Sequence, residues 1–405
     1  MEEKLIERLT RYVKIDTESD SGSTSVPSTE KQFDLLNVLK SELVEIGLED
    51  VMLDDKGYLF ATLPGNSDID TVVGFMAHVD TSPDFSGKDV NPKVVQYVGG
   101  DIVLNEESGI VLTPDDFPSL MSHVGHSLMV TDGTTLLGAD NKAGVANIVT
   151  AVEYLLNNPE IDRPKVRIAF TPDEEIGRGP HYFDVPAFGA DHAYTVDGGG
   201  VGELQYESFN AAGVRLTVHG KSVHPGTAKD TMINAGRIAA EFVTWFDALD
   251  TPEHTSGHEG FIHVNSIAGN AESAEVIMII RDFDMEKFEA RKRLVEENVE
   301  KLKDIYGESI ATLEMVDQYY NMKEKIEPVM EIVEVAKQAM QYLDIDVKIA
   351  PVRGGTDGSQ LSYKGLPTPN LFTGGYNFHG KFEYASIDEM VLSTQTIVEI
   401  IKRTV

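Results

Sequence analysis

Short apolar runs alternate with helical patterns through the first half of the chain. Residues 71–79, TVVGFMAHV, form a continuous apolar run, which is typical of a strand buried on both faces. KAGVANIVTAVEYLLNN at 142–158 predicts a helix, and KVRIAFT at 165–171 and HAYTV at 192–196 predict further strands. Because strands and helices alternate, we expect an α/β domain with a mixed, mostly parallel sheet.

The hydrophobic pattern changes after about residue 207. Residues 210–219 alternate between apolar and polar, as a half-buried strand does; residues 275–284 do the same, and a long charged helix follows. Strands beside helices predict an α+β lid domain over residues 208–322. Residues 1–207 and 323–405 then form one discontinuous domain.

The C-terminal part returns to the first pattern. PVMEIVEVAKQAMQYL is expected to be helical, and VKIAPVRGGTDGS and LPTPNLFTGGYNFHG are expected to form strand and loop. The last segment, SIDEMVLSTQTIVEIIKR, predicts an amphipathic helix that opens with a capping box between Ser386 and Glu389.

Composition narrows the class of protein. The 405 residues include 34 Lys and Arg against 67 Asp and Glu, a formal charge of -33, so a nucleic-acid partner is not expected. Runs of about 18 uncharged apolar residues are absent, so we expect no membrane span. The chain has no cysteine, which excludes disulfides and thiolate ligands. That absence, with an N-terminus unlike a signal peptide, favours a cytoplasmic location.

Metal-type donors follow the apolar runs at several points. Open α/β sheets bind ligands beyond the carboxyl ends of their strands, where such residues would meet. Each residue alone has an ordinary explanation: a hydrogen-bonded histidine, a helix cap, a turn, or solvated surface acids. Only the joint pattern favours a binding site. Its members are His78, Asp80, Asp140, Asp173, Glu174, Glu175, Asp197 and His379.

Two histidines and several carboxylates suit Zn²⁺, Mn²⁺ or Co²⁺. The donors exceed the usual three of one catalytic zinc, so we expect two metals about 3.5–4 Å apart with one bridging carboxylate. Asp80 lies two residues after His78 and would face the same way on a strand, where it could orient the ring. Of Glu174 and Glu175, one would ligate a metal and the other accept a proton from water. The pattern alone does not say which.

The segments MAHVD, GADNKAG, TPDEEIG, VDGG and FHG closely resemble the motifs of the M20 metallopeptidases, and the resemblance covers nearly the whole chain. It implies a di-zinc peptidase catalytic domain with an inserted lid. The resemblance also implies a cis peptide bond between Asp140 and Asn141.

The resemblance assigns roles to the metal-type donors. His78 and Asp197 would bind one zinc, and Glu175 and His379 the other. Asp140 would bridge the two, Glu174 would be the general base, and Asp80 would orient His78.

Substrate contacts also follow from the resemblance. His224, in SVHPG, would point toward the scissile carbonyl, although a histidine with only a structural role before proline would have the same sequence pattern. Arg281 and Arg353 are candidates for the terminal carboxylate of a peptide, which a planar guanidinium binds well; Arg281 could equally be a strand-surface charge. Gly354 and Gly355 would let the backbone approach the substrate.

The implied function is that of a metallo-aminopeptidase that releases the N-terminal residue from tripeptides through a water held between two zinc ions. Its partners would be a small peptide substrate and, through the lid, a second copy of the chain. Alternatives within the family are a dipeptidase, a carboxypeptidase and an N-acyl amino acid deacylase. Two alternatives lie outside this family. A noncatalytic metal-binding protein would not need the general base Glu174, and a metal-dependent phosphoesterase would require more basic residues around the metals.

Overall fold

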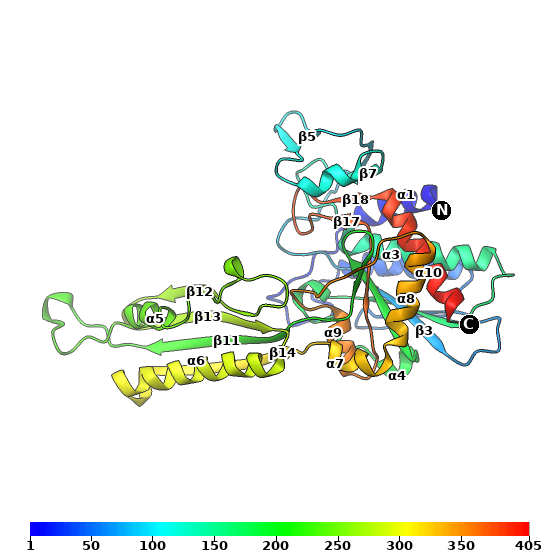
Figure 1. The fold of residues 1–405 in the computed structure, drawn as a ribbon. Coiled ribbons are helices and arrows are strands. Elements are labelled where there is room, and N and C mark those ends of the chain that lie inside the picture. Colours follow the sequence, from blue (N-terminus) through cyan, green and yellow to red (C-terminus); the bar gives the residue numbers. More distant parts are fainter. Residues whose placement is uncertain (405) are drawn as a thin grey trace. The chain divides into compact units, whose positions relative to one another are not determined.

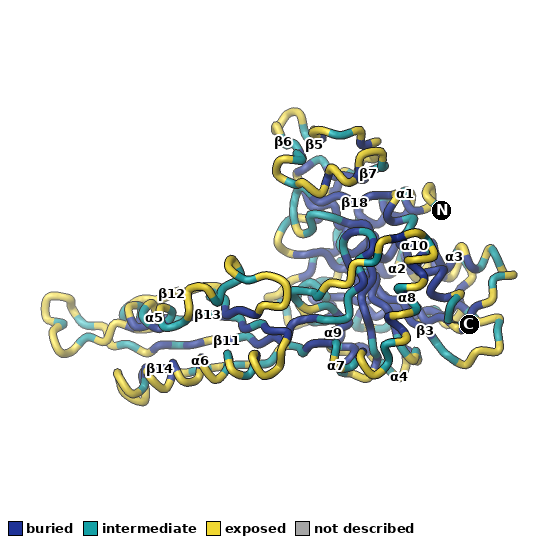
Figure 2. The backbone as a smooth tube through the Cα atoms, viewed as in Figure 1, coloured by how far each residue is buried: buried dark blue, intermediate teal, exposed yellow. Residues whose placement is uncertain are grey.

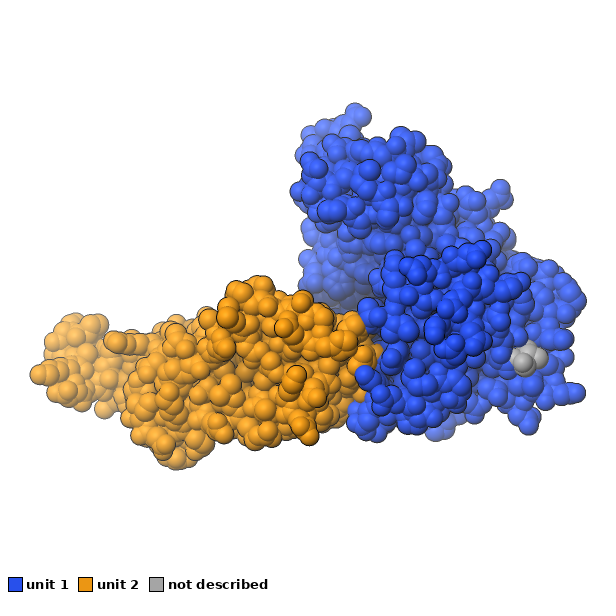
Figure 3. All heavy atoms as spheres, in the orientation of Figure 1, with its two compact units in different colours: residues 1–206, 322–350, 356–405 blue, residues 207–321, 351–355 orange. Residues whose placement is uncertain are grey.

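The chain divides into two units (Figure 3). Unit 1 comprises residues 1–206, 322–350 and 356–405, and unit 2 comprises residues 207–321 and 351–355. Residues 351–355, which were expected in the discontinuous domain, group here with the insertion. This structure, a computed structural model, describes residues 1–404.

A mixed eight-stranded sheet forms the centre of unit 1 (Figure 1). Strands β8, β3, β9 and β16 run parallel, whereas β1, β2 and β8 are joined in antiparallel pairs. The strands in spatial order are β1 (Glu49–Leu53), β2 (Leu59–Leu63), β8 (Lys165–Thr171), β3 (Val72–His78), β9 (His192–Gly198), β16 (Asn370–Phe372), β10 (Glu203–Gln205) and β15 (Lys348–Ile349). The strands predicted at 71–79, 165–171 and 192–196 are therefore confirmed as β3, β8 and β9.

Helices cover both faces of this sheet. On one face α3 packs against β3, β9, α1 and α10, and on the other an aromatic cluster including Phe183 and Phe188 packs against Phe60 and Met76. The continuous apolar runs follow from this double cover, because both faces of β3 and β8 are buried (Figure 2). The helices are α1 (Glu2–Val13), α2 (Gln32–Ile46), α3 (Ala139–Asn157), α4 (Val185–Phe188), α7 (Lys323–Ile326), α8 (Glu331–Tyr342), α9 (Asp357–Tyr363) and α10 (Ile387–Arg403).

Two features of unit 1 differ from the sequence-based expectations. Helix α9 begins within GGTDGS, where strand and loop were expected. At the start of α10, the Ser386 hydroxyl accepts the Glu389 N–H at 3.3 Å, but the Glu389 side chain does not return to the N-cap. It accepts a hydrogen bond from the Tyr376 hydroxyl at 2.7 Å instead, so the predicted capping box is only half formed.

A small antiparallel sheet, which the sequence analysis did not foresee, also belongs to unit 1. Its core includes Tyr97, Leu128 and Tyr384. Its strands, in spatial order, are β17 (Gly375–Tyr376), β18 (Tyr384–Ser386), β7 (Ser127–Val130) and β4 (Lys93–Gln96). The hairpin of β5 (Ile102–Asn105) and β6 (Ile110–Leu112) and the short 3₁₀ helix η1 (Pro118–His123) lie between β4 and β7 in the chain.

Unit 2 is an antiparallel sheet of four strands with two helices packed on one face. Alternate residues of β13 are buried, as the period-two pattern predicts, because only one face is covered. The elements are β12 (Phe261–Gly269), β13 (Ser273–Asp282), β11 (Asn210–His219) and β14 (Ala311–Tyr319) in spatial order, with α5 (Ala235–Val243) and α6 (Met285–Tyr306).

The two ends of the insertion are hydrogen-bonded to each other. The Asn321 N–H donates to the Asn210 side chain at 2.9 Å, and the Ser208 N–H donates to the Asn321 side chain at 3.1 Å. The chain therefore enters and leaves unit 2 at one place.

Within residues 1–404, no helix combines the length and the apolar character that crossing a bilayer requires.

Candidate metal centre

The predicted metal ligands gather at one edge of the large sheet. Strands β3, β8 and β9 are parallel neighbours, so their carboxyl ends meet there. His78 ends β3, Asp197 lies near the end of β9, and the 3₁₀ helix η2 (Glu174–Ile176) follows β8. Asp140 lies in the first turn of α3, and His379 follows β17 in the chain.

Two groups of donors share the Asp140 carboxylate. His78 Nε2 lies 3.0 Å from Asp140 Oδ1 and 3.2 Å from Asp197 Oδ1. His379 Nε2 lies 3.3 Å from Asp140 Oδ2 and 3.0 Å from Glu175 Oε2. The two oxygens of Asp140 therefore face different histidines, which is the arrangement a bridging carboxylate needs.

These distances fit metal ligation. Zinc bonds of about 2.0–2.1 Å at the tetrahedral angle put neighbouring ligand atoms about 3.3 Å apart. Ligand atoms of His78, Asp140 and Glu175 lie within 4.8 Å of one another, and so do those of His78, Glu174 and Asp197. Glu175 Oε1 is buried without a hydrogen bond. The donor set is the nitrogen and oxygen mixture that Zn²⁺, Mn²⁺ and Co²⁺ accept.

Crowding of carboxylates makes the centre electrostatically costly without a cation. Burial first, and then the charge of Asp140, raise the pKa of Glu175 to about 8. Burial likewise raises the pKa of Glu174 well above its ordinary value. Divalent cations would compensate the negative charges of these carboxylates. A metal-binding site therefore explains why acidic side chains gather here.

Asp80 holds the two glutamates as well as the histidine. Its carboxylate oxygens accept the N–H of Glu174 at 3.0 Å and the N–H of Glu175 at 3.2 Å. His78 Nδ1 lies 3.0 Å from the Asp80 carbonyl oxygen and 3.3 Å from its Oδ1. The contact between Asp80 and the ring of His78 was expected from the sequence, whereas the bonds to the glutamate backbone were not.

Asp173, the first of the three consecutive acids, has a structural role. Its φ is 58°, and its carboxylate accepts hydrogen bonds from the Ser28 N–H at 2.8 Å and the Gln32 side chain at 2.7 Å. It therefore anchors the turn before η2 to the segment that leads into α2.

Two buried carboxylates beside the centre were missed by the sequence analysis. Glu383 accepts the backbone N–H groups of Leu137 at 2.7 Å, Gly138 at 2.8 Å and Asp140 at 3.0 Å. Asp357 accepts the Thr171 hydroxyl at 3.0 Å. No pattern marks Glu383, since its partners are backbone groups that any residue could supply. The Asp140–Asn141 peptide bond is cis, as the resemblance implies.

Three of the predicted substrate residues have ordinary local contacts within unit 2. His224 caps the 3₁₀ helix η3 (Pro225–Thr227), and its Nδ1 accepts the Gly226 N–H at 3.1 Å. At Gly355 a Cβ atom would come within 2.6 Å of the Tyr319 ring, so packing alone requires glycine there. Arg353 donates to the carbonyls of Gly257 at 2.7 Å and Glu259 at 2.8 Å.

Arg281 is also held by neutral acceptors. It donates to the carbonyls of Ala212 and Ile280 and to the Gln318 side chain, at 2.9–3.2 Å. Across the described residues, no carboxylate forms an ion pair with Arg281 or Arg353. The roles of all four unit 2 residues remain predictions.

Comparisons with known proteins agree with this architecture. Residues 206–309 match the family model of the M20 peptidase dimerisation domain. Peptidase T of Geobacillus thermodenitrificans is 58% identical over 404 residues, covering 99% of this chain and 98% of that protein.

Solved structures give the same result for the fold. An aminopeptidase from Bacillus cereus aligns with a TM-score of 0.80 at 24% identity, covering 100% of this chain and 99% of that one. A tripeptidase from Staphylococcus aureus aligns with a TM-score of 0.79 at 21% identity, covering 100% and 98%. The identity over the full length shows that this chain belongs to the peptidase T family of M20 peptidases.

Proposed function

We propose that the chain is a zinc-dependent aminopeptidase that releases the N-terminal residue from tripeptides. The observation that carries this proposal is the Asp140 carboxylate, whose two oxygens face two separate histidine–carboxylate groups. The name of the solved S. aureus neighbour, a tripeptidase, supports the length of the substrate. The cytoplasmic location stays a prediction.

Five residues would hold two metal ions. His78 and Asp197 would bind one, and Glu175 and His379 the other, with Asp140 shared; the short distances within each group support this division. When bound, such ions polarise a carbonyl and lower the pKa of water toward neutrality.

Glu174 would move the proton. Among the described residues its carboxylate makes no hydrogen bond, so it is available to a water, while Asp80 holds its backbone N–H. Glu174 would take a proton from the attacking water and pass it to the leaving amine. Burial, which raises its pKa, makes it a stronger base than an exposed glutamate.

Arg281 and Arg353 would recognise the carboxylate end of the peptide. Their hydrogen bonds go to neutral oxygens and aromatic rings lie beside both guanidinium groups, so within the described residues no carboxylate compensates either charge. Arg281 also lies over the Tyr319 ring, 5.5 Å from its centroid, and burial lowers its pKa. His224 would stabilise the negative charge that develops on the scissile carbonyl oxygen.

Unit 2 would also pair two copies of the chain. The matched dimerisation model spans residues 206–309, and β12 is an edge strand whose residues 265–269 are exposed. An exposed edge strand is a ready partner for another chain.

A matched substrate series tests this function. We would compare Met-Gly-Gly, Met-Gly, Met-Gly-Gly-Gly and acetyl-Met-Gly-Gly after chelation, with and without added zinc. Fast release of free Met from the tripeptide alone, restored by zinc, is expected. Equal cleavage of the dipeptide or the acetylated peptide would instead indicate a dipeptidase, a carboxypeptidase or a deacylase.

A separate experiment tests the proposed contacts of Arg281 and Arg353 with the terminal carboxylate of the peptide. Arg281→Lys and Arg353→Lys keep the charge but lose the planar fork, so each should raise KM for Met-Gly-Gly more than it lowers kcat. Arg215→Lys, which alters an exposed arginine of the same sheet paired with Glu275, is the matched control. Unchanged KM in both test variants would remove these residues from the substrate site.

A further inference from the structure

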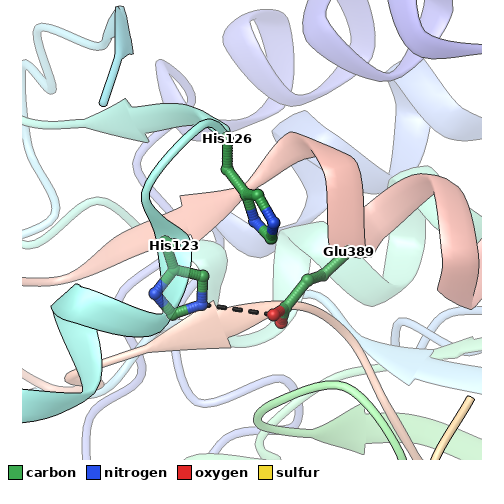
Figure 4. Close-up of side chains that lie close together, drawn as sticks. All are labelled: His123, His126 and Glu389. Atoms are coloured by element: carbon green, nitrogen blue, oxygen red, sulfur yellow. Dashed lines mark ion pairs between the residues drawn. The ribbon is translucent and has the colours of Figure 1, made fainter. Parts of the chain in front are cut away.

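A second cluster of metal-type donors in unit 1 shares no residue with the metal centre (Figure 4). His123 ends η1, His126 immediately precedes β7, and Glu389 lies in the first turn of α10. One ligand atom from each of the three lies within 4.8 Å of the other two. Segments distant in the sequence thus bring two imidazoles and one carboxylate together.

The contact between His123 and Glu389 has the spacing of two ligands of one ion. Nε2 of His123 lies 3.2 Å from Oε1 of Glu389, yet this nitrogen makes no hydrogen bond. Zinc bonds of about 2.0–2.1 Å at the tetrahedral angle separate neighbouring ligand atoms by about 3.3 Å. An ordinary buried ion pair would align the N–H with the oxygen, because the bond is strongest there.

The remaining polar atom of each side chain has its own partner. His123 Nδ1 lies 3.3 Å from the Tyr384 hydroxyl, and His126 Nδ1 lies 2.9 Å from the Ser386 hydroxyl. Glu389 Oε2 accepts hydrogen bonds from the Tyr376 hydroxyl at 2.7 Å and the Val201 N–H at 3.2 Å. Metal-binding histidines and carboxylates are usually oriented in this way, by a hydrogen bond at the atom that does not bind.

Burial makes this arrangement costly without a cation. His123 is 0% exposed and Glu389 is 4% exposed, whereas His126 is partly exposed and gives a route from solvent. A buried imidazole nitrogen left without a hydrogen bond costs about 1–3 kcal/mol. Glu389 also leaves the capping box that its sequence position offers. A bound ion accounts for the orphaned nitrogen of His123, whereas the turned carboxylate of Glu389 is held by Tyr376 and Val201.

We propose that His123, His126 and Glu389 bind a third divalent metal ion, zinc or a cation of similar preference such as cobalt. Two histidines and one glutamate are a known three-ligand set for zinc, in which water completes the fourth position. The ion would join α10 to the segment that leads into β7, so its role is structural. This proposal does not depend on the aminopeptidase function.

Metal stoichiometry of the full-length protein tests the site. We would saturate the chelated protein with Zn²⁺, remove free metal by gel filtration, and measure zinc by mass spectrometry. Wild type should hold three ions per chain, and His126→Gln and Glu389→Gln should each hold two. His181→Gln, a change at a histidine outside both clusters, is the control and should hold three.

Activity and thermal melting separate this site from the metal centre. His126→Gln should cleave Met-Gly-Gly at the wild-type rate. Added Zn²⁺ should raise its Tm less than that of wild type, because the variant binds one stabilising ion fewer in the folded state. Equal zinc content in wild type and a folded Glu389→Gln protein would overturn the proposal, even if tripeptide cleavage were confirmed. Three ions in a folded His126→Gln protein would overturn it equally.

Discussion

Replacing Glu383 with glutamine should weaken metal binding although Glu383 is not among the predicted metal ligands. The wild-type carboxylate accepts the N–H groups of Leu137 and Gly138 on one oxygen and the N–H of Asp140 on the other. Glutamine keeps one oxygen for the first two donors. Its amide nitrogen then faces the Asp140 N–H, and two donors cannot bond to each other.

The magnitude follows from that single lost bond. A buried donor left without an acceptor costs about 1–3 kcal/mol, and a bond to a charged acceptor lies at the upper end. Because the lost bond holds the backbone of Asp140, the ligand should be less well oriented. Changes to groups that orient metal ligands typically cost about 10–100-fold in metal affinity.

The assay is zinc affinity by chelator competition, with urea unfolding of the chelated protein as the measure of stability. Burial raises the pKa of Glu383 to about 7, so measurements at about pH 8.5 keep the wild-type side chain ionised. Glu399→Gln is the matched control, because Glu399 is a mostly buried glutamate of α10 whose partners are Lys402 and Arg403. If Glu383→Gln bound zinc within twofold of wild type, the orienting role of Glu383 would be refuted.

Three further predictions follow from single side chains. Glu174→Gln should lower kcat about 10²–10⁴-fold with metal content unchanged, whereas Glu175→Gln should lose metal; the reverse result would exchange their roles. Gly144→Ala should destabilise the fold by about 1–3 kcal/mol in urea unfolding, because its Cβ would meet the Val196 carbonyl oxygen at 2.0 Å; wild-type stability would contradict that contact. Burial lowers the pKa of His192, so the unfolded chain binds more protons, and stability should fall as pH decreases through about 6.5. His192→Gln should reduce that slope, and an unchanged slope would contradict this assignment.

The large sheet and the gathering of the predicted metal ligands at its edge were predictable from sequence for a physical reason. Strands buried on both faces must be continuously apolar, so β3 and β8 stand out, and the polar donors after them are conspicuous. The division of roles between Glu174 and Glu175 came instead from the family resemblance. Adjacent residues with the same side chain carry no local signal that separates them.

The small sheet and the Glu389 contacts could not be predicted in this way. The strands of the small sheet are two to four residues long, which is too short to show a hydrophobic period. The Ser386-to-Glu389 spacing is a sound helix-start signal, and the serine does cap the helix. Tyr376 and His123 contact the Glu389 side chain only after segments distant in the sequence have come together, so no local pattern could reveal these contacts.

The hydrogen bonds that join Asn210 and Asn321 have a consequence for protein engineering. Since the insertion starts and ends at one place, a short linker could replace it in the surrounding domain at little cost in loop-closure entropy. Homologous insertions could be exchanged at the same junction without lengthening the path of the host chain. Segment 351–355 would have to be exchanged with them, because it belongs to the same unit although it lies 30 residues further along the chain.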